Sequence, residues 1–379
     1  MTERNEISLN SVYIKTKIFF GENSLSHLQS FKNKKIWIIC DEFLVKNKKL
    51  ETILAYIDKS NNVCIFDKVV PEPPISVIGS GVAIIKKINP DIVIAYGGGS
   101  AIDTAKGILY FARIQNFVDK VNFIAIPTTS GTGSEVTSAT VITDTENKSK
   151  HIIFDDNLLP DEAILDANLT LSVPQTITAN TGIDVLTHAI EAYVAKKSNV
   201  YSDALAEKSV ELVIEALVKC YIDGNDIEAR EKMHEASNLA GIAFNIAGLG
   251  INHSLAHQIG GKFHIPHGLS NALLLEKVID YNCRDYNTLK KYAKLVYKSN
   301  MVEKDKDEKF AVDVLKNYIT VIKKVMNMPM TLRECKVSDE EFNKEKIIMA
   351  QNALKDTCTS TNPVETTVED MKMLLNLVC

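Results

Sequence analysis

Short runs of apolar, largely β-branched residues alternate with longer segments of helical periodicity in the first half of the chain. The apolar runs cover residues 35–40, 62–66, 91–96 and 122–126. Such continuous runs, each bounded by polar residues, are typical of strands that are buried on both faces. Between them, apolar residues recur every three or four positions, as in residues 75–88, which predicts a helix. Strands alternating with helices favour a parallel sheet with helices on its faces.

The pattern changes after Pro174. From Thr178 onward the periodicity is helical almost throughout, most clearly in residues 184–195, 202–220 and 227–247. We therefore predict an α/β domain over residues 1–175 and an all-helical domain over residues 176–379. Two further predictions concern the ends of these domains. The segment 11–20 alternates weakly and predicts an antiparallel edge strand, and the polar stretch 355–363 predicts a loop before the last helix.

Composition excludes several classes of protein. The chain is 45% hydrophobic and 24% charged, as in ordinary globular proteins, and its net charge of -5 gives no reason to expect nucleic acid as a partner. Its seven cysteines are scattered without a CxxC pair, which disfavours a disulfide framework or a structural zinc site and indicates reduced thiols. The N-terminus has no apolar signal-peptide core, and no run reaches the roughly 18 apolar residues of a membrane helix. We expect a soluble, cytoplasmic protein without a membrane partner.

Two loops rich in glycine and hydroxyl groups follow neighbouring predicted strands. The first begins at Gly97-Gly98-Gly99-Ser100 and opens a helix, and the second begins at Pro127-Thr128-Thr129-Ser130. Glycines allow close approach of a ligand, and free N–H groups at a helix start favour a diphosphate. A plain turn and an N-capped helix are the alternatives. Both loops lie at carboxyl ends of strands, where open α/β sheets bind nucleotides, although the first loop is not the GxGxxG fingerprint.

Asp41 ends the first predicted strand. A carboxylate at this position could accept hydrogen bonds from an adenosine ribose and would repel a 2′-phosphate, which favours NAD over NADP. A helix N-cap is an equally good interpretation of this residue taken alone.

Five of the eight histidines fall in two short segments of the helical half. Asp184 and His188 lie four residues apart, on one face of a predicted helix, and His253 and His257 repeat that spacing. His264 and His267 follow within ten residues of His257. Any one of these histidines taken alone is more often an ordinary core or surface residue. Three imidazoles with one carboxylate would suit a divalent ion such as Fe²⁺ or Zn²⁺.

Together, the segments GGGSAIDTAK, PTTSGTGSEVTSATVITD, TGIDVLTHAIEAYV and GLGINHSLAHQIGGKFHIPHG resemble the group III, iron-dependent alcohol dehydrogenases in order and spacing. The resemblance extends from about Phe20 to the last helices. It implies a dehydroquinate synthase-like fold, with an α/β nucleotide-binding domain followed by an all-α domain. It also implies Fe²⁺, with Zn²⁺ as the alternative, and NAD(H) as cofactors, and a homodimer or larger homo-oligomer.

The resemblance assigns roles to individual residues. The metal ligands would be Asp184, His188, His253 and His267, and His257 would assist proton transfer near the metal. The expected cofactor contacts are Asp41, Gly98, Gly99, Ser100, Asp103, Thr128, Thr129, Ser134, Thr137 and Lys150. Only the resemblance suggests Lys150.

Within the family, the segments KKIWIICDEFL and GGKFHIPHGLSNALLL resemble enzymes of the propanediol-utilisation type, which act on 1-propanol and propionaldehyde. This resemblance implies interconversion of short primary alcohols and aldehydes, such as 1-propanol/propionaldehyde or ethanol/acetaldehyde, and association with a bacterial microcompartment. The segment Pro71-Glu72-Pro73-Pro74 departs from the family pattern. A zinc-dependent glycerol dehydrogenase, a dehydroquinate synthase-like lyase and a catalytically silent binding protein are the alternatives. The number of histidines, the lack of extra lysines near them and the intact cofactor loops disfavour these three respectively.

Overall fold

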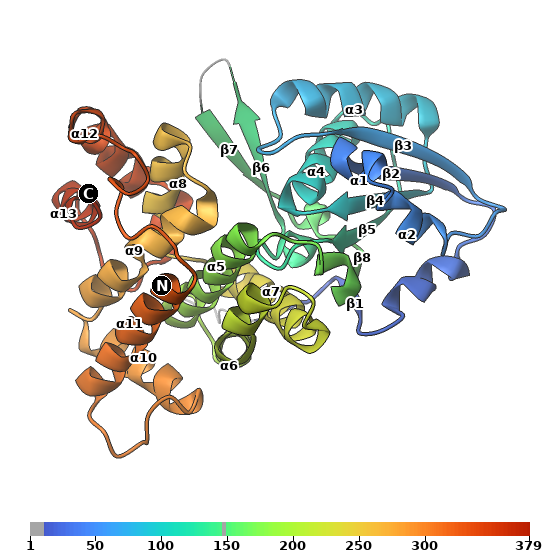
Figure 1. Ribbon diagram of the computed structural model, residues 1–379. Helices are drawn as coiled ribbons and strands as arrows, with labels where there is room; N and C mark the ends of the chain where they lie inside the picture. Colours follow the sequence, from blue (N-terminus) through green and yellow to red (C-terminus); the bar gives the residue numbers. More distant parts are fainter. Residues whose placement is uncertain (1–10, 146–148) are drawn as a thin grey trace, which may run out of the picture.

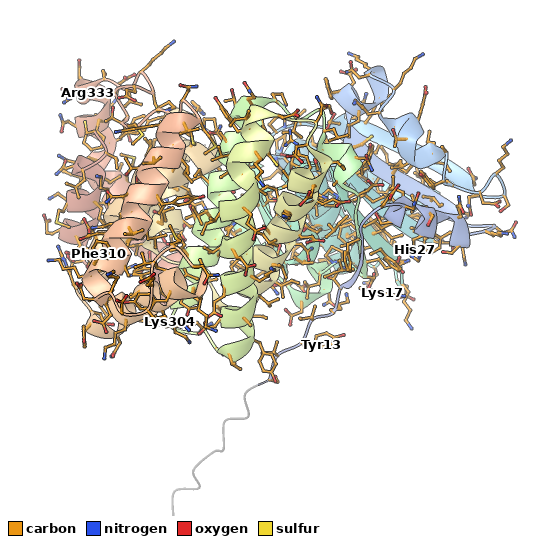
Figure 2. The ribbon with its side chains drawn as sticks, turned by 60° about the horizontal axis from the view of Figure 1, so that its bottom comes forward. Tyr13, Lys17, His27, Lys304, Phe310 and Arg333 are labelled. Carbon is orange, nitrogen blue, oxygen red and sulfur yellow. The ribbon has the colours of Figure 1, made fainter. Side chains whose placement is uncertain are left out.

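A computed structural model shows an α/β half and a helical half side by side (Figure 1). It describes residues 11–145 and 149–379, and for Ser149 and Lys150 the backbone alone. Figure 2 shows Lys17 and His27 in the α/β half and Phe310 and Arg333 at the opposite end of the molecule. The long green and yellow helices stand between these two ends. The predicted fold class is confirmed.

The α/β half is built on a parallel sheet of six strands in the order β1-β8-β5-β4-β2-β3. The strands are β1 (Lys17–Phe20), β2 (Lys35–Asp41), β3 (Asn62–Val69), β4 (Ile92–Gly97), β5 (Asn122–Pro127) and β8 (Glu162–Leu165). A separate antiparallel hairpin consists of β6 (Ala139–Asp144) and β7 (Ser149–Phe154). β2, β4 and β5 are consecutive in the sheet, so the loops that follow them meet at one edge.

Burial on both faces explains the continuous apolar runs. Trp37 and Ile39 of β2 pack into a core under α3 (Ile75–Ile88) and α4 (Gly99–Ile114). The alternate residues of β2 pack on the opposite face, against η1 (Ser24–Ser30), α1 (Glu42–Lys46) and α2 (Leu50–Leu54). Since successive side chains of a strand point to opposite faces, every position of β2 from Ile36 to Cys40 has to be apolar.

The helical half encloses a separate core. Its helices are α5 (Gln175–Val194), α6 (Val200–Ile222), α7 (Ile227–Ala247), α8 (Ile251–Phe263), α9 (His267–Asn282), α10 (Tyr286–Lys298), α11 (Glu308–Val325), α12 (Asp339–Lys355) and α13 (Val368–Asn376). The remaining short 3-10 helices are η2 (Ser134–Val136), η3 (Asp156–Leu158) and η4 (Ala167–Thr170) in the α/β half and η5 (Thr357–Thr361) in the helical half. β8 ends at Leu165 and α5 begins at Gln175, and we propose the division between residues 175 and 176.

The prediction for residues 11–20 was wrong in one respect. β1 lies at the sheet edge, as expected, but it pairs with β8 in parallel, with Lys17 opposite Glu162. The two strands are far apart in sequence, so no tight turn joins them to impose an antiparallel direction.

Among the described residues, no single helix is both long and apolar enough to span a membrane. One pair, α7 with α8, has the necessary length and composition together, but the two helices meet at 109°.

Candidate active site

Asp184, His188, His253 and His267 lie close together in the helical half, and we call them the histidine cluster. α5 carries Asp184 and His188 on one face, while α8 and α9 carry the other two. The Nε2 atoms of His188, His253 and His267 lie 3.9, 3.7 and 3.6 Å from the same Oδ1 atom of Asp184. Three nitrogen donors and one carboxylate oxygen thus converge on a single point.

This geometry fits a bound divalent ion. Metal–nitrogen bonds of about 2.1 Å in a tetrahedral site put neighbouring ligand atoms about 3.4 Å apart, close to the separations in the cluster. Three imidazoles and a carboxylate also match the ligand preferences of Fe²⁺ and Zn²⁺. The donor set therefore fits the metal that the sequence resemblance implies.

The electrostatics of the cluster leave two of its three histidines neutral and its aspartate ionised. Burial lowers the pKa of His188 to about 4 and that of His267 to about 3, so both rings are neutral at physiological pH. Burial also acts on His253, but the negative charges of Glu191 and Asp184 outweigh it and raise the pKa of His253 to about 9. Although burial opposes ionisation of Asp184, the surrounding histidines hold its pKa well below the usual range. Displacing a proton from His253 would accompany metal binding.

Two buried residues that the sequence did not single out contact the cluster. Glu191 accepts a hydrogen bond from Nδ1 of His253 at 2.5 Å. Nδ2 of Asn271 donates to Oδ1 of Asp184 at 2.6 Å, and the Asn271 side chain in turn accepts from Nδ2 of Asn252 at 2.9 Å. Glu191 continues the helical spacing of Asp184 and His188 by three residues, and this spacing was a usable signal. Asn271 had no comparable signal, because α8 and α9 bring it to the cluster.

His257 lies beside the cluster, one turn after His253 on α8. Its ring stacks on that of His267, with centroids 5.4 Å apart, and its side chain keeps 22% exposure. Nδ1 of His257 donates to Oδ2 of Asp356 at 2.9 Å. Burial opposes ionisation of Asp356, yet the bond from His257 lowers the pKa of this carboxyl to about 2. The bond leaves Nε2 of His257 available to exchange a proton.

The predicted cofactor loops meet at the carboxyl edge of the sheet. Asp41 ends β2 and caps α1, with Oδ1 accepting from the backbone N–H of Leu44 at 3.0 Å. The loops after β4 and β5 touch, since the N–H of Thr128 donates to the carbonyl of Gly97 at 3.0 Å. A Cβ at Gly98 would lie 3.2 Å from Oγ1 of Thr129. Gly98, Gly99, Ser100, Thr128 and Thr129 all remain partly exposed there.

Three other predicted cofactor contacts, Asp103, Ser134 and Thr137, instead form hydrogen bonds inside the fold, with one another or with Lys106. Oγ of Ser134 donates to Asp103 at 2.7 Å, and Nζ of the fully buried Lys106 donates to Ser134 at 3.1 Å. Lys106 also donates to the carbonyl of Thr137 at 2.7 Å. These side chains hold the loop in shape, so any role in cofactor contact stays a prediction. Lys150 lies outside the side chains that the structure describes.

The loop between β5 and β6 is fastened along one face of α7. The paired residues are Ser130 with His234, Glu135 with Asn238, and Ser138 with Asn245, at 3.0, 2.9 and 2.9 Å. Between these bonds the two backbones touch, because a Cβ on Gly133 would lie 2.6 Å from the Cα of Gly241. Gly133 also has a φ of 61°, which glycine adopts without strain. Sequence reasoning missed α7 as a partner of this loop.

His234 leads to a testable pH dependence. It is buried, and burial lowers its pKa from 6.5 to about 4. Between these two values the unfolded chain binds more protons than the folded protein, so the free energy of unfolding falls as the pH falls. We expect the wild type to lose about 3 kcal/mol more than His234→Gln between pH 7 and pH 4, measured by urea unfolding.

The variant His264→Gln is the matched control for this experiment, since His264 is exposed. It should lose as much stability on acidification as the wild type does. Identical pH dependence of the wild type and His234→Gln would contradict the expectation.

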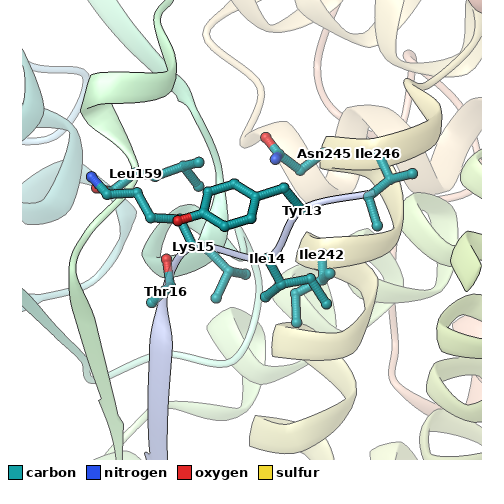
Figure 3. A pocket seen from close by; sticks show the side chains of 9 residues that line it. Tyr13, Ile14, Lys15, Thr16, Leu159, Ile242, Asn245 and Ile246 are labelled. Carbon is teal, nitrogen blue, oxygen red and sulfur yellow. The ribbon is translucent and has the colours of Figure 1, made fainter. Parts of the chain in front are cut away.

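A small pocket elsewhere contains none of the predicted site residues. Figure 3 shows the segment from Tyr13 to Thr16 crossing from α7 to β1, with Ile242, Asn245 and Ile246 beside it. Oγ1 of Thr16 donates to the carbonyl of Pro160 at 2.8 Å. These contacts fix the start of the described chain and do not form part of the cluster.

Comparison with known proteins identifies the class. The profile of the iron-containing alcohol dehydrogenases matches residues 15–167, and that of the C-terminal part of the Fe-containing alcohol dehydrogenase family matches residues 178–378. The chain belongs to the iron-containing alcohol dehydrogenase family. It is therefore an oxidoreductase that interconverts alcohols and aldehydes, with iron as the metal of its family.

Individual proteins that are similar to this chain have names that include particular substrates. The chain is 43% identical to the 1-propanol dehydrogenase PduQ of Citrobacter freundii, over 97% of this chain and 99% of the relative. A crystal structure of 1,3-propanediol oxidoreductase is similar with a TM-score of 0.90 and 32% identity, over 98% and 100% of the two chains. A sulfoacetaldehyde reductase from Bifidobacterium kashiwanohense, solved in complex with NAD⁺, gives a TM-score of 0.86 and 26% identity, over 98% of each chain.

Proposed function

We propose that this protein reduces a short aldehyde, with propionaldehyde as the first candidate, to the primary alcohol with NADH, and catalyses the reverse reaction with NAD⁺. The observation that carries the proposal is the convergence of three imidazole Nε2 atoms within 3.9 Å of one oxygen of Asp184. These four residues would hold Fe²⁺. The similarity to a 1-propanol dehydrogenase over nearly the full chain supports the substrate class.

The cofactor loops supply the second half of the site. Gly98 is the N-cap of α4 and Gly99 is its first residue, and the free N–H groups at this helix start favour a diphosphate. Thr128 and Thr129 lie in the neighbouring loop. The similar reductase solved with NAD⁺ supports a dinucleotide at this edge of the sheet. The nicotinamide would then carry the hydride, so no nucleophile from the protein is required.

Residues beside the cluster accept and return the proton of the substrate hydroxyl. When bound, the metal ion would polarise the substrate oxygen and favour its negatively charged form. Asp356 holds His257 with Nδ1 protonated, so Nε2 can accept or return the proton of the substrate hydroxyl, directly or through water. His188 and His267, which are neutral at physiological pH, would offer their nitrogen lone pairs to the metal ion.

Metal removal and replacement test this function. Protein stripped of metal and then given Fe²⁺ or Zn²⁺ is assayed without oxygen for propionaldehyde-dependent NADH oxidation. Activity should return with metal and be lost in His267→Ala. An absence of turnover with any short aldehyde, despite bound metal and NADH, would overturn the proposal and favour a lyase or a silent binding protein.

Asp41 sets the expected preference for NADH over NADPH. Its carboxylate at the end of β2 would face the ribose and repel a 2′-phosphate. Asp41→Asn removes the charge but keeps the oxygen that caps α1. We expect kcat/KM with NADPH to rise by roughly tenfold, which corresponds to about 1.4 kcal/mol. The value for NADH should change much less, and an unchanged ratio of the two would contradict this role.

We also propose a homodimer or larger homo-oligomer, which the resemblance to the family implies, and association with a bacterial microcompartment, which the resemblance to the propanediol-utilisation type implies. Residues 1–10, which would include a targeting segment, lie outside the described residues. Fusion of the first dozen residues to a fluorescent protein would test targeting in cells that form such compartments.

A further inference from the structure

Glu191 is a buried carboxylate on the face of α5 that carries Asp184 and His188. Its side chain is 3% exposed. Among the residues that the structure describes, its one ion pair is with His253, and no lysine or arginine forms a bond with it. A buried charge is costly unless it is paired and hydrogen-bonded. The two oxygens of Glu191 are therefore expected to serve a defined purpose.

One oxygen of Glu191 closes the start of α8. The N-cap of α8 is Gly250, which has no side chain to bond the first free N–H groups. Oε1 of Glu191 accepts from the N–H of Asn252 at 2.8 Å instead, and Oδ1 of Asn362 accepts from that of Ile251 at 3.3 Å. A Cβ on Gly250 would lie 2.7 Å from Oε1 of Glu191, so the absent side chain makes room for this carboxylate.

The other oxygen of Glu191 fixes His253. Oε2 lies 2.5 Å from Nδ1 of the imidazole, and a carboxylate can only accept a bond from that nitrogen. The proton of the neutral ring is thus held on Nδ1, which leaves the lone pair of Nε2 directed at the cluster. Carboxylate partners of this kind orient metal-binding histidines and raise their basicity.

Charge balance gives a further reason for a carboxylate here. Asp184 supplies one negative charge to the cluster, and a divalent ion carries two positive charges. With Glu191 ionised, the buried group of metal, Asp184, Glu191 and neutral histidines has no net charge. A neutral group is much less costly to bury than a charged one.

We propose that Glu191 is a positioning residue for the metal site, which fixes the tautomer and orientation of His253 while it anchors the start of α8 to α5. This inference rests on the proposed function, because it requires the histidine cluster to bind a metal ion. Glu191 itself contacts neither the substrate nor the cofactor.

The test compares metal binding by the full-length wild-type protein and two variants of it. Glu191→Gln keeps an oxygen that can accept from Asn252 but removes the negative charge. Glu276→Gln is the control, since Glu276 is also buried but pairs with Lys323 on α11, and its loss should weaken folding alone. Affinities for Zn²⁺ and Co²⁺ are measured by competition with a chelating dye, and the absorption bands of the Co²⁺ form report ligand geometry.

Glu191→Gln is expected to bind metal 10- to 100-fold more weakly than the wild type, with shifted Co²⁺ bands. Glu276→Gln should melt at a lower temperature yet keep the wild-type affinity and spectrum. If Glu191→Gln does not fold, Glu191→Asp decides, because it keeps the charge without the reach and should lose roughly tenfold in affinity.

The two proposals fail in different ways. Wild-type affinity and spectrum in the folded Glu191 variant would overturn the role of Glu191, while the wild type would still bind metal. Failure of the wild type itself to bind Zn²⁺, Co²⁺ or Fe²⁺ would overturn the proposed function.

Discussion

Asp184→Asn is expected to lose iron and to lower kcat/KM for aldehyde reduction roughly a thousandfold. Three imidazole nitrogens converge on one oxygen of Asp184, so this residue would supply both a ligand atom and a negative charge that attracts the ion. Metal catalysis contributes several kcal/mol, and about 4 kcal/mol corresponds to the expected loss of rate. Metal content by mass spectrometry and steady-state kinetics check both parts.

Asp166→Asn is the matched control for this variant. Asp166 is also a buried carboxylate, but it caps the η4 turn in the α/β half. The control should keep full metal content and wild-type kinetics. If Asp184→Asn retained iron and activity at the wild-type level, the histidine cluster would not be the metal site.

Gly268→Ala is expected to combine a loss of stability with a loss of metal affinity. Gly268 follows His267 on α9, and a Cβ there would lie only 2.1 Å from the carbonyl oxygen of Asn180 on α5. The backbone of α5 cannot move aside locally, so the two helices must separate, and His267 moves away from Asp184. Overpacking typically costs 1–3 kcal/mol, and we expect about 3 kcal/mol here because the contact is with backbone.

The metal affinity of Gly268→Ala should fall at least about tenfold, as measured by chelator competition alongside urea unfolding. Gly261→Ala provides the control, since a Cβ at this position on α8 meets no atom within 4 Å. The control is expected to be as stable as the wild type or slightly more stable, because alanine favours helix over glycine. Equal stability and equal metal affinity of Gly268→Ala and Gly261→Ala would contradict the expectation.

The strength of the local pattern decided how much of the fold could be predicted. α3 and α7 begin and end at the predicted residues, because their apolar periodicity continues along their whole length. The hairpin β6–β7 was not predicted, since β6 contains two threonines and an aspartate, β7 begins with three polar residues, and only Thr140 and Ile142 of β6 are buried. β8 was also missed, because four residues are too few to establish a period.

The sequence predicted only those residues of the candidate site that lie in a recognisable spacing or motif. The structure brings Asp184, His188, His253 and His267 together as expected, although their role as ligands stays a prediction. Asp356 could not be found, because it reaches His257 only when η5 packs against α8. The burial of Ser134 and Lys106 likewise follows from tertiary packing, which the sequence of the loop does not indicate.

The contact between Gly133 and Gly241 has a mechanical consequence. The loop after β5 meets α7 backbone to backbone and is bonded to it on either side, and it is also bonded through Ser134 to Lys106 on α4, so it ties the two halves of the molecule together. We expect a hinge motion that opens the molecule to bend outside this contact, because sliding the loop over α7 or lifting it from α4 would break buried hydrogen bonds. The carboxyl edge of the sheet beside this loop would then keep its spacing to α7 throughout the motion.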